Sequence, residues 1–134
     1  MSSVNPLHVP VARRRVLIVE DHEDGRQALR LLLTLLGHEV EVAEDGVAGI
    51  EKALAMRPEV AIVDLNMPRL DGYGVARVLR QAFGVAIILI ACTAYDHPEA
   101  RARVVQAGFD AHLIKPLDLD LLSPWLQTGD VSTQ

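Results

Sequence analysis

Hydrophobic positions along the chain fall into short runs that alternate with longer amphipathic stretches. The short runs are rich in β-branched residues, and three of them are almost continuously apolar. Such a run is typical of a strand that helices cover on both faces. The run EVEVA alternates instead, which predicts an edge strand with one face in water. The expected strands are residues 15–20, 39–43, 60–64, 85–91 and 111–115.

The stretches between these runs place apolar residues at helical spacing and carry residues that start or stop helices. Gly37 and Pro58 follow two of them as stops, and Pro98 fits the first turn of another. Asp71 is placed to cap a further helix, with Gly72 easing the turn. The expected helices are residues 24–36, 45–56, 72–82, 97–107 and 117–126.

Five repeats of strand and helix predict an α/β fold with a parallel sheet and helices on both of its faces. Right-handed crossovers connect the strands of such a sheet. Ligands bind beyond the carboxyl ends of the strands, near a switch in strand order. Polar residues at the strand ends are therefore the first candidates for a functional site.

Composition narrows the class of protein further. A chain of 134 residues with 50% hydrophobic residues suits one domain with its own core, and a net charge of −5 argues against general nucleic-acid binding. The single cysteine, Cys92, cannot form a disulfide within the chain and is expected to be a small core residue. The sequence shows no run long enough for a membrane span and no signal peptide, so we expect a cytoplasmic protein. Residues 1–13 are expected to form a flexible arm.

Acidic, hydroxyl and amine side chains follow the ends of the expected strands. Glu20 and Asp21 follow the first strand, Asp64 ends the third, the fourth runs into Thr93, and Lys115 ends the fifth. Clustered carboxylates repel one another, and a hard divalent cation such as Mg²⁺ would relieve that repulsion. A cation, an ammonium group and a hydroxyl around one open position suit a phosphoryl group, with Asp64 as the nucleophile.

Each of these residues also has a plainer interpretation when taken alone. Asp64 could cap its strand or begin an Asx turn, and Thr93 could be an ordinary strand residue. Lys115 could be a solvated strand end, and His22 is expected to be a rim histidine rather than a metal ligand. The phosphoryl interpretation depends on all of the strand ends being considered together.

Four motifs, in order and each at a strand end, resemble the receiver domain of two-component response regulators. They are VLIVED, AIVDLNMPRLDG, ACTAY and IKP, and the resemblance covers about residues 14–127. It implies a flavodoxin-like (βα)5 three-layer sandwich with strand order 2-1-3-4-5. It also makes residues 14–127 the receiver domain and residues 128–134 a C-terminal tail.

The resemblance implies a role for each matching residue. Asp64 matches the aspartate that accepts phosphate from a histidine kinase or phosphotransfer protein. Mg²⁺ would be held by Glu20, Asp21, Asp64 and the main-chain carbonyl of Asn66, with Glu20 acting through a water.

The remaining matches concern the switch and the phosphate contacts. Thr93 matches the switch hydroxyl, and Lys115 matches the lysine that contacts a phosphate oxygen. Pro116 would follow a cis peptide bond. His112 stands where the family usually carries an aromatic switch residue; a histidine can fill that role and could also titrate near neutral pH. The alternative is a plain surface histidine.

Two rival functions and two forms of the protein stay open. An aspartate-nucleophile phosphatase usually needs a second acid two residues after the nucleophile, where this chain has Asn66. A receiver-like interaction module that is never phosphorylated is the other rival. Because residues 128–134 are too few for an output domain, we expect a single-domain regulator or a segment of a hybrid kinase. We expect it to be a monomer or weak homodimer, to bind no nucleic acid and no membrane, and to have no enzymatic activity beyond its own phosphorylation and dephosphorylation.

Overall fold

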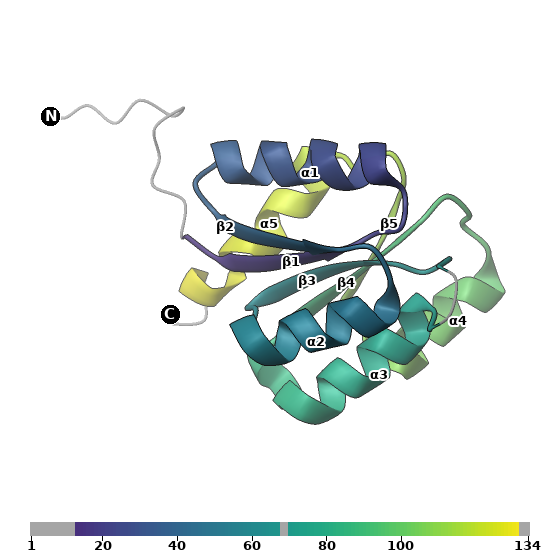
Figure 1. Ribbon diagram of the computed structural model, residues 1–134. Helices are drawn as coiled ribbons and strands as arrows, with labels where there is room; N and C mark the ends of the chain where they lie inside the picture. The colour runs from purple at the N-terminus through teal and green to yellow at the C-terminus, as the bar shows by residue number, and fades with distance from the viewer. Residues whose placement is uncertain (1–12, 68–69, 132–134) are drawn as a thin grey trace, which may run out of the picture.

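The computed structural model describes residues 13–67 and 70–131. Most of the expected arm, Pro68 and the last residues of the expected tail lie outside this description. The elements follow the predicted alternation of strand and helix (Figure 1). In chain order they are β1 Arg15–Val19, α1 Glu23–Leu35, β2 Glu39–Ala43, α2 Gly46–Met56, β3 Val60–Asp64, α3 Gly72–Phe83, η2 Gly84–Ala86, β4 Ile88–Thr93, α4 Pro98–Ala107, β5 Ala111–Ile114 and α5 Leu119–Val131.

The five strands of the described residues form one parallel sheet in the order β2-β1-β3-β4-β5. This order confirms the flavodoxin-like topology, and it confirms that EVEVA is an edge strand. Because β1 and β3 are neighbours, the carboxyl ends of the first and third strands lie side by side. Val19 pairs with Val63 in this register, so Glu20 and Asp64 emerge next to each other.

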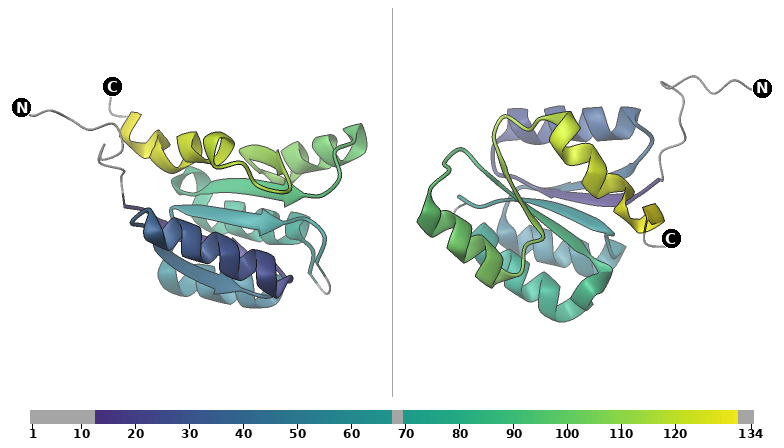
Figure 2. Two further views of the ribbon diagram at one scale, coloured as in Figure 1. Left: turned by 90° about the horizontal axis from the view of Figure 1, so that it is seen from above. Right: turned by 180° about the vertical axis from the view of Figure 1, so that it is seen from behind.

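Helices cover both faces of the sheet, which gives a three-layer sandwich (Figures 1 and 2). Helices α1 and α5 pack on one face over the side chains of Val16, Ile18 and Ile62. Helices α2, α3 and α4 pack on the other face over Leu17, Val19 and Val63. The alternation of side chains along one strand therefore supplies both cores, and β1 and β3 are buried on both sides as their apolar runs predict.

Local capping chemistry explains where several helices begin and end. Asp45 and Asp71 each accept a hydrogen bond from a first-turn N–H of α2 and α3, at 2.8 and 3.0 Å. Pro98 occupies the first turn of α4 as predicted, and His97 accepts the capping N–H of Ala100. Gly37 adopts a φ of +100° after α1, a conformation that glycine tolerates best.

The largest differences from the predicted boundaries are in β4 and α5. The apolar run 85–91 is not all strand, because Gly84–Ala86 form a 3₁₀ turn and β4 begins only at Ile88. Val85 is 98% exposed there, so a hydrophobic side chain lies outside the core it was expected to join. Helix α5 begins after Asp118 and runs to Val131, beyond the expected end at residue 126. Within the described residues, none of the helices has the length and apolar character that a bilayer crossing needs.

Candidate functional site

Main-chain hydrogen bonds place the candidate residues at one edge of the sheet. The N–H of Glu20 bonds to the carbonyl of Ala43 on β2, which extends the β1 ladder past its last residue. The N–H of Lys115 bonds to the carbonyl of Thr93, which does the same for β5. Asp64 pairs with Cys92 in the β3–β4 register. Glu20, Asp64 and Lys115 are therefore held by the sheet, whereas Asp21 lies in the loop that follows β1.

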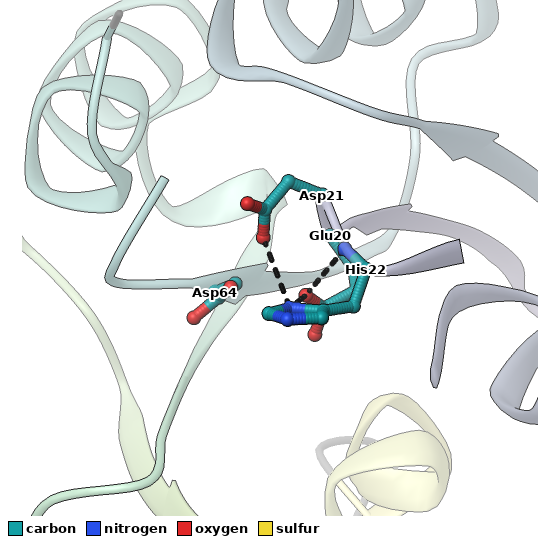
Figure 3. A group of neighbouring side chains, drawn as sticks. All are labelled: Glu20, Asp21, His22 and Asp64. Atoms are coloured by element: carbon teal, nitrogen blue, oxygen red, sulfur yellow. Dashed lines mark hydrogen bonds and ion pairs between the residues drawn. The ribbon is translucent and has the colours of Figure 1, made fainter. Parts of the chain in front are cut away.

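The structure brings together the acidic residues that the sequence predicted to meet. Ligand atoms of Glu20, Asp21, His22 and Asp64 all lie within 4.8 Å of one another (Figure 3). Asp64 is only 4% exposed, whereas His22 is mostly in solvent. His22 places its Nδ1 3.5 Å from Asp21 Oδ1 and 3.6 Å from Glu20 Oε2, at the rim of this group.

Lys115 supplies the positive charge of the site. Its Nζ donates to Glu20 Oε1 at 2.6 Å and lies 3.5 Å from Asp64 Oδ2. One ammonium group thus joins carboxylates from the ends of two neighbouring strands. The peptide bond between Lys115 and Pro116 is cis, as predicted.

Burial and these contacts shift the protonation equilibria of the site. Burial and, to a smaller extent, the nearby Glu20 carboxylate raise the pKa of Asp64 to about 7, against the opposing hydrogen bond from the Asn66 N–H. Burial also pushes the pKa of Glu20 upward, but the hydrogen bonds from Lys115 and from the His22 N–H outweigh it and leave that pKa below its usual value. The pKa of Lys115 is raised because Glu20 and Asp64 outweigh its burial.

The donor set fits a hard cation. Asp21 Oδ1 is buried and has no hydrogen-bond partner among the described residues. His22 Nδ1 lies 3.5 Å from this oxygen but makes no hydrogen bond to it. A buried oxygen without a hydrogen bond is costly, so its presence beside two further carboxylates is physically consistent with a cation site. The group offers mainly oxygen ligands, which Mg²⁺ prefers over nitrogen or sulfur.

Asp64 also makes the local turn that its plainer interpretation predicted. Its Oδ1 accepts the N–H of Asn66 at 3.2 Å, the pattern of an Asx turn. This bond leaves Oδ2 facing Lys115, so the turn orients the carboxylate and does not remove it from the site. The two interpretations of Asp64 are therefore compatible.

Gly72 allows a close approach of main chains at the start of α3. Its conformation is not the left-handed one that requires glycine, so the need for glycine comes from the space around it. A Cβ at this position would lie 2.4 Å from the carbonyl oxygen of Asp64 and 2.8 Å from the Cα of Leu65. Gly72 therefore lets the start of α3 pack against the main chain of the candidate acceptor.

Thr93 lies on the same edge but outside the acidic group. Its buried Oγ1 accepts hydrogen bonds from the Tyr95 N–H at 3.1 Å and from Asn66 Nδ2 at 3.5 Å. Thr93 and Asn66 line a cavity of about 560 Å³ beneath α4, together with the aromatic rings of Tyr73 and Tyr95. Asn66 thus connects Asp64, through its N–H, with Thr93, through its side chain.

His112 is not part of this cavity. It lines a separate hollow of about 390 Å³ between α4 and β5, beside Asp96 and Arg101. Its Nε2 is buried without a hydrogen-bond partner among the described residues, and burial lowers its pKa. The predicted switch role of His112 stays a prediction.

Cys92 is a core residue, as expected. Its side chain is buried at the end of β4, and burial raises the pKa of its thiol to about 12. A thiol in this state is a poor nucleophile and a poor metal ligand.

Arg26 contacts the site but was missed in the sequence analysis. It lies in α1, three and seven residues before the inward-facing Leu29 and Leu33, and it is only 9% exposed. Its Nη1 donates to the main-chain carbonyls of Glu20 at 3.0 Å and of Asp21 at 3.4 Å. The available signal was a charged residue on the apolar face of a helix that follows two acids.

Comparisons with known proteins agree with this geometry. The model of the response regulator receiver domain family matches residues 16–127. Response regulator MprA of Mycobacterium ulcerans is 39% identical over 108 residues, which are 81% of this chain and 46% of that protein. The chain thus spans about half the length of the curated relatives it matches.

Solved structures share the fold over nearly the whole chain. The chemotaxis protein CheY4 of Vibrio cholerae superposes with a TM-score of 0.80 at 30% identity, covering 87% of this chain and 98% of that one. The response regulator TrrA of Thermotoga maritima, solved in complex with Mg²⁺ and BeF, has a TM-score of 0.72 at 27% identity, covering 90% and 97%. The fold, the order of the motifs and these matches show that the chain belongs to the receiver domain family of two-component response regulators.

Proposed function

We propose that Asp64 is the phosphoacceptor and that the protein receives its phosphoryl group from a phosphohistidine. The donor would be a histidine kinase or a histidine phosphotransfer protein. The observation that supports this most directly is the convergence of Glu20, Asp21 and Asp64, with Lys115 Nζ 3.5 Å from Asp64 Oδ2. The rival phosphatase function is not favoured, because Asn66 cannot protonate a leaving group.

In the proposed transfer, an oxygen of the Asp64 carboxylate attacks the phosphorus atom. The bond between phosphorus and the donor imidazole nitrogen breaks, that nitrogen keeps the electron pair, and an acyl phosphate forms on Asp64. Lys115 would neutralise charge on the transferred oxygens once these displace its contact with Asp64. The main-chain N–H of Asn66 would keep the carboxylate oriented during the attack.

Mg²⁺ is the proposed cofactor. Asp21, Asp64 and the carbonyl of Asn66 would hold it directly, and Glu20 would act through a water. The ion would supply positive charge against the developing charge of the phosphoryl oxygens. TrrA, to which the chain is similar, was solved in complex with Mg²⁺ and BeF, which supports Mg²⁺ as the ion.

The signal would leave the site through Thr93 and its neighbours. Thr93 Oγ1 now accepts from Tyr95 and Asn66, so a phosphoryl group on Asp64 would offer this hydroxyl a new, stronger acceptor. Rotation of Thr93 would change the cavity beneath α4, and His112 would follow on the neighbouring strand. A protein partner would then bind the altered face of α4, β5 and α5. We propose no turnover of external substrates.

Intact mass spectrometry after incubation with acetyl phosphate and Mg²⁺ tests the acceptor. The native chain is expected to gain the mass of one phosphoryl group, and Asp64→Asn is expected to gain none. Asp24→Asn, which changes an exposed aspartate of α1, is the matched control and should be modified like the native chain. A chelator should abolish the adduct.

The opposite outcomes are equally clear. An adduct that persists in Asp64→Asn would assign the acceptor elsewhere. A native chain that takes phosphate neither from acetyl phosphate nor from a phosphohistidine protein would be a receiver-like interaction module instead.

A further inference from the structure

Arg26 is a buried cation next to the acidic group that the proposed function does not use. Burial of a guanidinium is costly unless its donors are satisfied. Its hydrogen-bond acceptors among the described residues are main-chain carbonyls, not carboxylates. Those carbonyls belong to Glu20 and Asp21, the residues that supply two of the clustered carboxylates.

The loop between β1 and α1 lacks another common support. His22 is the residue before the first turn of α1, and its side chain makes no capping hydrogen bond. Glu20 Oε2 accepts the N–H of His22 at 3.1 Å, so this loop uses a site carboxylate to satisfy its own main chain. Arg26 therefore supports this loop from inside the helix in a different way, because its Nη1 donates to the two preceding main-chain carbonyls.

We propose that Arg26 is a positioning residue for the Mg²⁺ site. The inference rests on the proposed function, because it concerns the same acidic group. A fixed carbonyl fixes the peptide plane on either side of Asp21, and that plane sets the direction in which the Asp21 side chain leaves the main chain. The buried Asp21 Oδ1, which has no hydrogen-bond partner among the described residues, is the atom whose direction depends on this contact. Figure 3 shows Asp21 above Glu20 and His22, with its carboxylate turned toward the group.

A role for Arg26 through its charge and a role through positioning predict opposite changes in Mg²⁺ affinity when Arg26 is replaced. If its positive charge acted mainly by repelling a cation, its removal would tighten Mg²⁺ binding. If it positions Asp21 and Glu20, its removal releases the loop and weakens Mg²⁺ binding. Substitution of residues that orient metal ligands commonly costs tenfold or more in affinity. The sign of the change therefore separates the two effects.

Calorimetric titration of the full chain with Mg²⁺ tests the proposal. Arg26→Gln is expected to raise the Kd for Mg²⁺ about tenfold. Arg26→Lys keeps the positive charge but lacks the planar guanidinium with its several N–H donors. Its Kd for Mg²⁺ is therefore expected to lie between those of the native chain and Arg26→Gln. Arg30→Gln is the matched control, because Arg30 lies one turn further along α1, is exposed and donates to Gln27 Oε1 at 3.3 Å. It should bind Mg²⁺ like the native chain.

Kinetics give a readout that a purely structural role would not change. The rate of acyl phosphate formation in Arg26→Gln is expected to fall at limiting Mg²⁺ and to recover at saturating Mg²⁺. Thermal melts in the absence of Mg²⁺ show whether the variants are folded at the temperature of the titration. A folded Arg26→Gln that binds Mg²⁺ as tightly as the native chain, or more tightly, would overturn the proposal.

The test keeps this proposal separate from the proposed function. A native chain that binds Mg²⁺ but forms no adduct would contradict phosphotransfer to Asp64, and the variant affinities would still decide the role of Arg26. Lack of Mg²⁺ binding by the native chain would overturn the role of Arg26 itself.

Discussion

At the scale of single residues, Asp64 combines burial with a charge that its chemistry requires. An unfolded chain would lose the Asp64 proton near pH 3.8, whereas the folded chain keeps it until about pH 7. Between these values the folded state binds the extra proton, so folding stability falls as pH rises. The contribution of protonated Asp64 to folding stability is complete below pH 3.8 and is lost as pH rises past about 7. A charged Asp64 is therefore unfavourable for folding when no cation is bound.

Asp64→Asn is expected to stabilise the Mg²⁺-free protein at pH 8. The gain should be on the order of 1–2 kcal/mol, because a neutral amide avoids the cost of a buried charge. Urea unfolding of the native chain and the variant at pH 5 and pH 8 measures it, and the gain should be largest at pH 8. Asp24→Asn removes an exposed charge and separates the effect of burial from that of net charge. An equal gain in both variants would contradict this prediction.

At the scale of elements, strand ends and helix starts meet around the acceptor. Helix α3 begins at Gly72, where its first turn packs on the main chain of Asp64 and Leu65. The Gly72 N–H also bonds to the carbonyl of Leu65 at 3.3 Å. This close approach joins the start of a helix to the end of a strand, and it leaves no room for a Cβ.

Gly72→Ala is expected to destabilise the protein by about 1–3 kcal/mol, because its methyl group overlaps main-chain atoms that have little freedom to move. Gly25→Ala is the matched control, since an added Cβ there meets nothing within 4 Å. Alanine is the better helix former, so Gly25→Ala should be neutral or stabilising by up to about 1 kcal/mol. Urea unfolding compares the two. Similar free energies of unfolding for both variants would show that the loop after β3 adapts to the methyl group.

The helices and strands themselves were largely predictable, and the exceptions are instructive. Periodicity located the strands and α-helices of the described residues but not η2, because each strand or α-helix buries one face or two and its apolar residues must recur accordingly. The predicted start of β4 was wrong because Val85 and Ala86 belong to the apolar run that predicts this strand. In the structure Gly84 turns the chain before them with a φ of +57°. Only the direction of the chain leaving α3 decides where the next strand can begin.

At the scale of the whole molecule, the edge of the sheet opposite the site carries its own polar cluster. The main-chain N–H of Arg14 donates to His38 Nδ1 at 3.1 Å. The side-chain Nε of Arg14 donates to the carbonyl of Leu126 on α5 at 2.7 Å. Glu59 joins the cluster through Arg14 Nη1 at 3.4 Å and through the N–H of Arg15 at 3.0 Å. The segment before β1 contacts α5 here, so this edge of the sheet holds α5 in place. The opposite edge, at the carboxyl ends of the strands, holds the candidate functional site.

His38 makes this cluster sensitive to acid. Burial lowers its pKa below 6.5, and the charge of Arg14 lowers it further. Between pH 6.5 and the lowered pKa of His38, the unfolded state binds a proton at His38 and the folded state does not. The contribution of neutral His38 to folding stability is therefore present above pH 6.5 and is lost as pH falls through the lowered pKa. Protonation would also remove the acceptor of the Arg14 N–H.

His38→Asn is expected to flatten the loss of stability between pH 7 and more acidic values, because an amide oxygen can accept the same N–H and does not titrate. Free energies of unfolding measured by urea at several pH values test this. A variant whose stability falls with acid as steeply as that of the native chain would show that other groups cause the loss.

The sequence alone determined the fold class, the edge position of β2 and the residues that were to meet at the strand ends. It could do so because burial imposes a period on each element, and because the carboxyl ends of parallel strands share one edge. The strand order came from the resemblance to a family, since local periodicity carries no record of which strands are neighbours.

Only the tertiary structure decided how the residues of that edge act on one another. The burial that raises the pKa of Asp64, the link from Lys115 to two strands, and the separation of His112 from the cavity of Thr93 all depend on distances between distant segments. The support of the acidic loop by Arg26 and the close approach at Gly72 are likewise contacts in space. Pattern along a chain records which side of an element is buried, whereas packing in three dimensions sets the dielectric, the partners and the room at each atom.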